Sequence, residues 1–214
     1  MKSIIRNNKV SFLIVSISLL VIVIFSSLVI IYDDLLIDRV VYNFLINNFS
    51  CGFMDKFMIA ITRLGDTKFV LVFTSFMFGL MLVGLKPKKI SLIFASSVGG
   101  IAFINQLLKF SVKRIRPNVD KLIEIGGYSF PSGHAMVSMI LYGLVSYLAY
   151  KVIKNKLIRN TVVVINCLVI LLIGISRIYL GVHYFSDIVV GFLISLLFLM
   201  FIIKILEKYV FSQN

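Results

Sequence analysis

The amino-acid sequence predicts an all-α fold: an integral membrane bundle of six transmembrane helices with short interfacial helices on its outer face. Of the 214 residues, 60% are hydrophobic and only 14% are charged, and the mean hydropathy is +1.04. A helix needs about 20 apolar residues to cross a hydrocarbon layer of roughly 30 Å. Six nearly uncharged runs approach that length, so the sequence excludes an ordinary water-soluble domain.

The six predicted spans follow one another with mostly short connections, at approximately residues 10–32, 69–85, 90–108, 134–150, 160–175 and 188–203. Lys2, Arg6 and Lys9 precede the first span, as in a secretory signal. Its apolar stretch is too long for a signal peptide and no small-residue cleavage site follows, so we expect a retained signal anchor. Since no repeat, low-complexity tract or Pro/Gly/Ser-rich linker interrupts the chain, we expect residues 1–214 to form a single domain.

The formal charge of +13 is divided unevenly between the two ends of the predicted spans. Twelve of the 22 basic residues and one acid, Glu207, fall at the two termini and in the loops after the second and fourth spans. Lysine and arginine concentrate in short cytoplasmic loops, so both termini are predicted to be cytoplasmic. Because the excess of basic residues lies at one set of span ends and not in a separate basic groove, it argues against a nucleic-acid partner. The lipid bilayer is the expected environment, and no obligate protein partner is evident.

The segment from residue 33 to residue 67 is the longest predicted connection and lies on the outer side. Phe53, Phe57, Ile61 and Leu64 recur at helical spacing, while the charged residues lie elsewhere on the helical wheel. This pattern predicts helices that lie on the membrane surface. Two roles stay open for them, a structural connection and a part in admitting a lipid.

Two basic residues, Lys109 and Arg116, follow the third predicted span at a separation of seven. On a continuing helix this separation rotates a side chain by only about 20°, so the two would project from one face. Pro117 disfavours helix at Arg116 and predicts that the helix ends there. A guanidinium binds two phosphate oxygens at once and an ammonium adds a point charge, so the pair suits a phosphoryl group. Taken alone, such residues more often anchor a helix end among lipid headgroups.

The sequence Pro131-Ser132-Gly133-His134 immediately precedes the fourth span. Pro131, Ser132 and Gly133 are typical of a helix start, where free amides and the helix dipole favour bound phosphate. Gly133 lets the backbone approach such an anion closely. His134 is therefore predicted at the rim of an anion site.

A third polar group, Arg177, His183 and Asp187, lies before the sixth span on the same predicted side. His183 and Asp187 are four residues apart, so the carboxylate can accept a hydrogen bond from one ring nitrogen and leave the other to attack phosphorus. Arg177 lies six residues before His183, about 240° around a helix, so both face one site only if the backbone breaks between them. Gly181 is available for that break.

The two histidines are the only ones in the chain, and both are predicted at outer helix ends near arginines. Ionisable groups at such depths are expensive unless they function, which favours catalysis over a structural role. Two histidines and one carboxylate could form a partial set of metal ligands, but the surrounding cations would repel a divalent ion. We therefore expect neither a metal nor another cofactor.

Taken together, Lys109-x6-Arg116-Pro117, Pro131-Ser132-Gly133-His134 and Ser176-Arg177-x5-His183-x3-Asp187 resemble the three-part signature of the type 2 phosphatidic acid phosphatase family. All three parts are present without substitution, and with the six spans the resemblance covers nearly the whole chain. It implies that His183 is a nucleophile that forms a phosphohistidine, that Asp187 orients it, and that His134 protonates the departing lipid oxygen. It also implies that the phosphate is bound by Lys109, Arg116, Ser132, Gly133 and Arg177.

The resemblance further implies a metal-independent lipid phosphatase whose active site faces outward from the cell membrane. The first expected reaction converts undecaprenyl pyrophosphate to undecaprenyl phosphate, since the small chain without a soluble domain suggests a bacterial enzyme. Phosphatidylglycerophosphate and phosphatidic acid are the alternative substrates. Lys113, Arg114 and Lys121 would favour a pyrophosphate head if they face it, although they could equally be solvated.

Two other functions compete with hydrolysis. A lipid phosphotransferase on the same scaffold would carry the same three motifs, so the sequence does not separate it from a phosphatase. A small transporter would need ionisable residues along a route inside its spans, and the predicted spans are nearly free of them.

Overall fold

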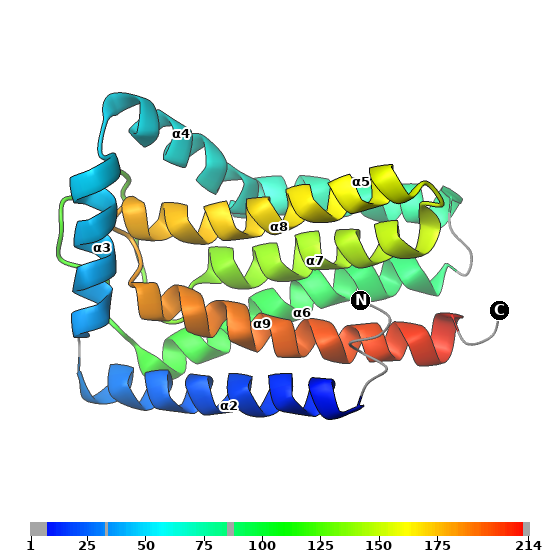
Figure 1. Ribbon diagram of the computed structural model, residues 1–214, viewed down its shortest axis with the longest axis horizontal. Coiled ribbons are helices and arrows are strands. Elements are labelled where there is room, and N and C mark those ends of the chain that lie inside the picture. The colour runs from blue at the N-terminus through cyan, green and yellow to red at the C-terminus, as the bar shows by residue number, and fades with distance from the viewer. Residues whose placement is uncertain (1–7, 33, 85–87, 212–214) are drawn as a thin grey trace.

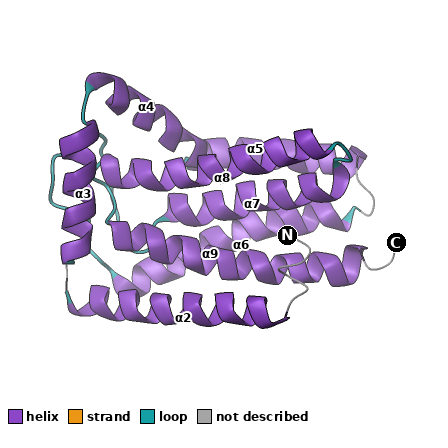
Figure 2. Ribbon diagram, viewed as in Figure 1, coloured by secondary structure: helices purple, strands orange, loops and turns teal. Residues whose placement is uncertain are grey.

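The computed structural model describes residues 8–32, 34–84 and 88–211. Within these ranges the chain forms helices and connecting loops, and no strand occurs (Figure 2). Lys2 and Arg6 of the N-terminal segment, and Lys86 of the loop after the second predicted span, lie outside the described residues.

Six helices in the described part of the chain are long and apolar enough to cross a membrane, as the sequence predicts. They run along a common direction (Figure 1). Their bounds are α2 (Asn8–Ile31), α5 (Thr67–Gly84), α6 (Lys89–Val112), α7 (Gly133–Val152), α8 (Lys156–Tyr179) and α9 (Phe185–Leu206). A π-helical turn, Glu207–Phe211, extends α9.

The helix bounds differ most from the prediction at α8, which extends four residues beyond the predicted span at each end. It begins after Asn155, whose Oδ1 accepts hydrogen bonds from the next free amides at 2.9 and 3.2 Å. The prediction stopped at charged residues, but Arg159 lies against the ring of Tyr150 and Arg177 donates to Thr62. Both arginines are therefore accommodated within α8 by partners on other helices.

Helix α7 lies at the centre of the bundle and packs against α6, α8 and α9. Its side chains Met136, Ile140 and Leu141 are fully buried. Helix α2 lies at the edge, where it contacts α9 (Figure 1). The first residues of α7 are thus held by packing from several directions.

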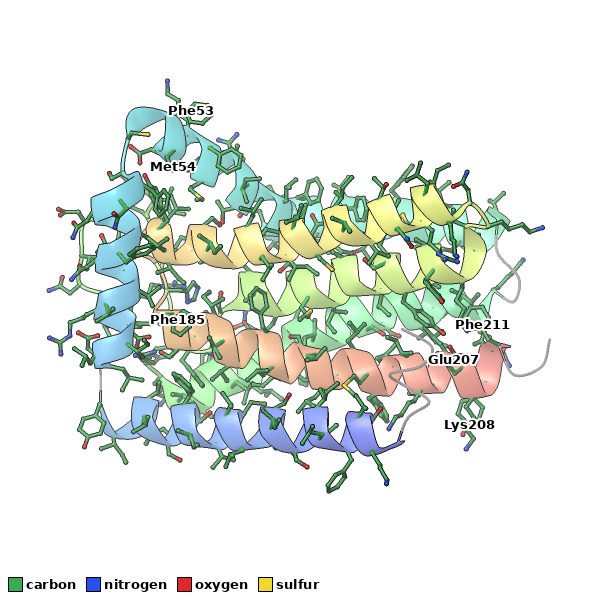
Figure 3. The ribbon with its side chains drawn as sticks, viewed as in Figure 1. Phe53, Met54, Phe185, Glu207, Lys208 and Phe211 are labelled. Atoms are coloured by element: carbon green, nitrogen blue, oxygen red, sulfur yellow. The ribbon has the colours of Figure 1, made fainter. Side chains whose placement is uncertain are left out.

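Two shorter helices, α3 (Leu36–Phe49) and α4 (Gly52–Thr62), cover one end of the bundle, and a 3₁₀ turn, Arg63–Gly65, joins α4 to α5 (Figure 1). The helices predicted between residues 33 and 67 are therefore present. Phe53 is 76% exposed and points away from the bundle (Figure 3), whereas Met58 is buried against Tyr179. Glu207 and the first turn of α2 lie at the opposite end of the bundle.

Candidate active site

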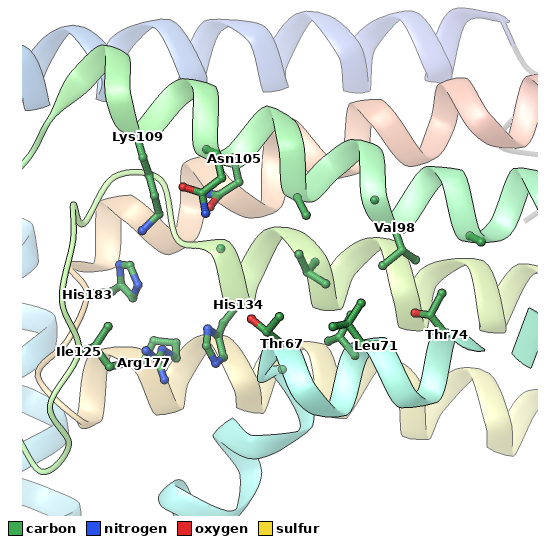
Figure 4. Close-up of a pocket in the computed structure, with 18 of the residues that line it drawn as sticks. Thr67, Leu71, Thr74, Val98, Asn105, Lys109, Ile125, His134, Arg177 and His183 are labelled. Carbon is green, nitrogen blue, oxygen red and sulfur yellow. The ribbon is translucent and has the colours of Figure 1, made fainter. Parts of the chain in front are cut away.

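A cavity of about 370 Å³ lies between α5, α6 and the first turn of α7. Its polar end gathers five side chains from three segments that are distant from one another in the sequence (Figure 4). These are Lys109, Arg116, His134, Arg177 and His183. Away from them the cavity continues between α5 and α6 along apolar side chains, which include Val70, Leu71, Ala95, Val98 and Ala102.

The imidazole of His183 is held between a carboxylate and a guanidinium. Its Nδ1 lies 3.2 Å from Asp187 Oδ2, and its Nε2 lies 3.2 Å from Arg116 Nη1. A carboxylate only accepts and a guanidinium only donates, so Nδ1 carries the proton and Nε2 keeps its lone pair. Burial lowers the pKa of His183 to about 3 despite the nearby carboxylate, which keeps the ring neutral. The site therefore holds a neutral imidazole with one unprotonated nitrogen.

The backbone around Gly181 brings Arg177 and His183 to the same cavity. Helix α8 ends at Tyr179, and Gly181 has φ +70°, a conformation that favours glycine. The amides of Val182 and His183 both bond to the carbonyl of Arg177 at 3.2 Å. The predicted break at Gly181 is therefore present.

Asp187 is fully buried at the start of α9 and uses both of its carboxylate oxygens. Oδ2 accepts from the hydroxyl of Ser129 and, at 3.0 Å, from the amide of Tyr184. Oδ1 lies 2.7 Å from Nη1 of Arg114, which is only 4% exposed. The suggestion that Arg114 contacts a headgroup is wrong, because a buried guanidinium paired with buried carboxylates has no access to one.

His134, in the first turn of α7, has a carboxylate partner of its own. Its Nε2 lies 2.9 Å from Oδ1 of Asp66, with side-chain exposures of 18% and 48%. The hydrogen bond from His134 lowers the pKa of Asp66. A Cβ on Gly65 would lie 2.9 Å from Cδ2 of His134, so only glycine fits beside the ring. Nothing local in the sequence links Asp66 to His134, 68 residues later in the chain.

The prediction that Lys109 and Arg116 share one face of a continuing helix is wrong. Helix α6 ends at Val112, and Lys113 takes a left-handed conformation with φ 54°. This turn directs Arg114 into the protein and leaves Arg116 in the following loop. Lys109 and Arg116 reach the same cavity through the fold of the loop and not through helical periodicity.

The three cationic side chains of the cavity bond mainly to uncharged oxygens. Lys109 Nζ donates to the carbonyl of Tyr128 at 2.5 Å, and Arg116 Nη1 donates to that of Val182 at 2.6 Å. Arg177 Nη1 donates to the Thr62 hydroxyl at 2.7 Å, and its buried Nε has no partner among the described residues. Since carbonyls and a hydroxyl carry no full charge, the three cations at the polar end of the cavity suit an anion with several oxygens.

Gly133 lines the cavity, whereas Ser132 does not. Ser132 is fully buried and caps α7, its Oγ accepting from the amide of Ala135 at 3.5 Å. A Cβ on Gly133 would lie 2.9 Å from Asn105 Oδ1, and Asn105 Nδ2 donates to the carbonyl of Pro131 at 2.9 Å. Asn105, which sequence reasoning missed, thus holds the turn before α7 against α6.

Known proteins share both the sequence pattern and this architecture. The sequence profile of the PAP2 superfamily matches residues 90–211. Phosphatidylglycerophosphatase B from Bacillus subtilis (strain 168) is 32% identical over 155 residues, which cover 71% of this chain and 74% of that protein.

Two solved structures have the same fold. The crystal structure of a transmembrane PAP2-type phosphatidylglycerolphosphate phosphatase from Bacillus subtilis superposes with a TM-score of 0.82 at 25% identity, covering 91% of this chain and 96% of that one. The crystal structure of LpxE from Aquifex aeolicus superposes with a TM-score of 0.63 at 24% identity, covering 80% of this chain and 98% of that one.

Proposed function

The chain belongs to the PAP2 superfamily and is a multi-pass membrane lipid phosphatase, and from this premise we propose that it removes the phosphate of phosphatidylglycerophosphate through a phosphohistidine on His183. The observation that carries the proposal is the cavity itself. One end gathers two histidines and three cations, and the other end is an apolar groove between α5 and α6 (Figure 4). A phosphate head and an acyl tail fit these two environments in one molecule.

In the first proposed step, His183 attacks the phosphorus atom. Lys109, Arg116 and Arg177 hold the phosphate oxygens and stabilise the charge that develops on them. The lone pair of Nε2 forms the N–P bond while the bond from phosphorus to the lipid oxygen breaks. Asp187, bonded to Nδ1–H, stabilises the positive charge that the imidazole gains.

His134 supplies the proton for the departing lipid oxygen. Its Nε2 is held by Asp66, so Nδ1 is the nitrogen that serves the substrate. In the second step a water molecule attacks phosphorus, His134 takes its proton, and the N–P bond breaks. Inorganic phosphate leaves, and both histidines return to their initial protonation states.

The proposed reaction needs no metal ion, because the cations of the protein occupy the role that a divalent ion has in many phosphatases. Among the described residues, no group of three or more His, Cys, Asp or Glu side chains is arranged to hold a metal. We expect activity to be unchanged by EDTA, measured as phosphate released from the purified protein. A strict requirement for added magnesium would contradict this part of the mechanism.

The active site is proposed to face the outside of the cell. The cavity lies at the α3 end of the bundle, and the ends of the described chain lie at the other (Figure 1). The basic residues predicted to be cytoplasmic, such as Lys151 and Lys156, belong to the end away from α3. The excess of positive charge there supports a cytoplasmic location for that end.

We propose phosphatidylglycerophosphate as the substrate, in place of the undecaprenyl pyrophosphate expected from the sequence, for two reasons. The Bacillus subtilis relatives carry the name of that activity. Arg114, one of three cations considered for a second phosphate, is buried against Asp38 and Asp187. A phosphate monoester matches the three cations that line the cavity.

The proposal is tested with purified protein and a panel of the three lipids, phosphatidylglycerophosphate, undecaprenyl pyrophosphate and phosphatidic acid. The expected result is the highest kcat/KM on phosphatidylglycerophosphate, with free phosphate as product and no need for an acceptor lipid. Phosphate appearing only on an added acceptor lipid would instead establish a phosphotransferase. A ranking led by undecaprenyl pyrophosphate would overturn the substrate assignment.

A second experiment tests the groove. Gly99 lines it on α6, and a Cβ there meets no atom within 4 Å, so Gly99→Leu fills the groove without displacing the protein. We expect KM for the lipid to rise about tenfold while hydrolysis of a tail-less aryl phosphate is unaffected. The matched control is Gly79→Leu on α5, where a Cβ likewise meets nothing but which lies outside the cavity lining.

A further inference from the structure

A buried polar network lies behind His183 and outside the lining of the cavity. It joins Asp38 of α3, Arg114 after α6, and Ser186 and Asp187 of α9, each at most 4% exposed. Arg114 bridges the two carboxylates: its Nη2 lies 2.8 Å from Asp38 Oδ2, and its Nη1 lies 2.7 Å from Asp187 Oδ1. The network therefore connects a helix outside the region matched by the family profile to the partner of His183.

Ser186 ties the network to the first turn of α9. Its amide donates to Asp38 Oδ1 and its hydroxyl to Asp38 Oδ2, both at 2.8 Å. Arg114 Nη1 also donates to Ser186 Oγ at 2.8 Å, and the guanidinium lies 3.8 Å from the ring centroid of Tyr184. The carboxylate of Asp38 is placed at the positive end of the α9 dipole, where negative charge is favoured.

The charges of the network explain why two carboxylates share one guanidinium. A buried Arg114–Asp187 pair alone would be neutral, and the guanidinium would draw the charge of Asp187 away from the imidazole. The negative charge of Asp38 offsets the positive charge of Arg114, so the network keeps one net negative charge beside His183. That negative charge stabilises the imidazole of His183 when Nε2 bonds to phosphorus and the ring becomes positive.

We propose that Asp38 and Arg114 are positioning residues for the nucleophile. Asp38 holds Arg114, Arg114 fixes Oδ1 of Asp187, and Oδ2 is thereby aimed at Nδ1–H of His183, which leaves Nε2 directed at the cavity. This inference rests on the proposed function of His183 as the nucleophile. It assigns to α3 a part in catalysis without contact with the substrate.

The kinetic test is Asp38→Asn, which removes a charge and keeps the shape of the side chain. We expect kcat to fall about 10- to 100-fold, as for other residues that orient a reacting group, with KM within about twofold. The matched control is Asp34→Asn, which removes the exposed ion pair with Arg39 near the start of the same helix. That control should keep wild-type kcat, and an Asp38→Asn variant with wild-type kcat would overturn the proposal.

A spectroscopic test separates positioning from a merely structural role. The chain has two histidines, so ¹⁵N-histidine labelling gives the signals of only two imidazoles, and His134→Gln assigns them. In the wild-type protein we expect the tautomer of His183 with the proton on Nδ1, and in Asp38→Asn a mixture of tautomers. If Asp38→Asn lost kcat while the His183 signals stayed at their wild-type positions, the positioning role would be excluded.

Ser186→Ala provides a second variant in case Asp38→Asn does not fold. It removes the bridging hydroxyl and keeps both ion pairs, so the expected loss of kcat is only several-fold with a partial tautomer change. Unchanged kcat and unchanged signals would overturn the proposal. Trapping of phosphate on wild-type His183 is measured separately: its absence would refute the nucleophile, while the tautomer measurement still tests the positioning.

Discussion

The two histidines of the cavity have the same kind of partner but opposite surroundings. His183 and Asp187 are both buried, and their contacts extend inward to Arg114 and Asp38. The pair of His134 and Asp66 lies nearer the solvent, with side-chain exposures of 18% and 48%. The imidazole of His183 is held in a single neutral tautomer, whereas the imidazole of His134 is partly exposed to solvent.

This difference in burial fits the two chemical tasks that we propose for His183 and His134. A nucleophile needs one orientation and an available lone pair, which a closed network of hydrogen bonds provides. A group that gives a proton in one step and takes it in the next needs access to water and a carboxylate that supports its charged form. Substitutions at His183 and at His134 are therefore expected to have different effects.

The largest expected effect is that of His183→Ala. Without Nε2 no N–P bond can form, so turnover should fall by about 10³-fold or more, and phosphoenzyme should be absent with every substrate. The measurement is phosphate release together with rapid quenching under alkaline conditions, where a phosphohistidine survives. Near-normal hydrolysis by this variant would refute the assignment of the nucleophile.

His134→Ala should be impaired in a way that depends on the leaving group. Release of an alkyl oxygen needs the proton, so kcat on the lipid should fall about 10²-fold. An aryl phosphate, whose leaving group departs as a stable anion, should form phosphoenzyme at a rate much closer to that of the wild type. Equal losses on both substrates would mean that His134 does not act as the acid.

Asp66→Asn should also slow hydrolysis of the lipid more than that of the aryl phosphate, but by a smaller factor than His134→Ala. Loss of the charged partner of His134 is expected to lower kcat on the lipid about tenfold, the value of one charge-assisted hydrogen bond. Phosphoenzyme formation from the aryl phosphate should be nearly unchanged. A variant equally slow on both substrates would indicate that Asp66 supports the fold of the 3₁₀ turn and not the acid.

The smallest expected effect is on stability at low pH. The pKa of His183 is lowered in the folded protein, so below about pH 6.5 the unfolded chain binds a proton that the folded site excludes. Stability is lost as the pH falls from that value, by up to about 2 kcal/mol at pH 5. We expect His183→Asn to lessen this loss, measured by unfolding in detergent at pH 7 and pH 5.

The same substitution at the partly exposed His134 serves as the comparison for this measurement. Its pH dependence should stay closer to that of the wild-type protein. If His183→Asn kept the full acid sensitivity of the wild type, burial of a neutral imidazole would not be its source.

Much of the fold could be predicted because hydrophobic runs report directly on a membrane environment. The three motifs likewise indicated which residues would meet, and Lys109, Arg116, His134, Arg177 and His183 line one cavity. The path between Lys109 and Arg116 was predicted wrongly, because Pro117 was read as the end of the helix. The left-handed turn at Lys113 directs Arg114 to its buried partners Asp38 and Asp187, and no local sequence pattern indicates that turn.

The sequence by itself determined the six apolar helices, the uneven distribution of charge and the residue types of the candidate phosphate site, because hydropathy and short spacings are local properties. The spacing of four residues predicted Asp187 as the partner of His183, but only the tertiary structure decided which carboxylate pairs with His134 and which groups hold Asp187. Asp38 lies 76 positions before Arg114, which it pairs with, and Asp66 lies 68 positions before His134, so both contacts arise from the tertiary fold. Such distant pairs leave no local signal in the sequence, and they give the two imidazoles their different surroundings.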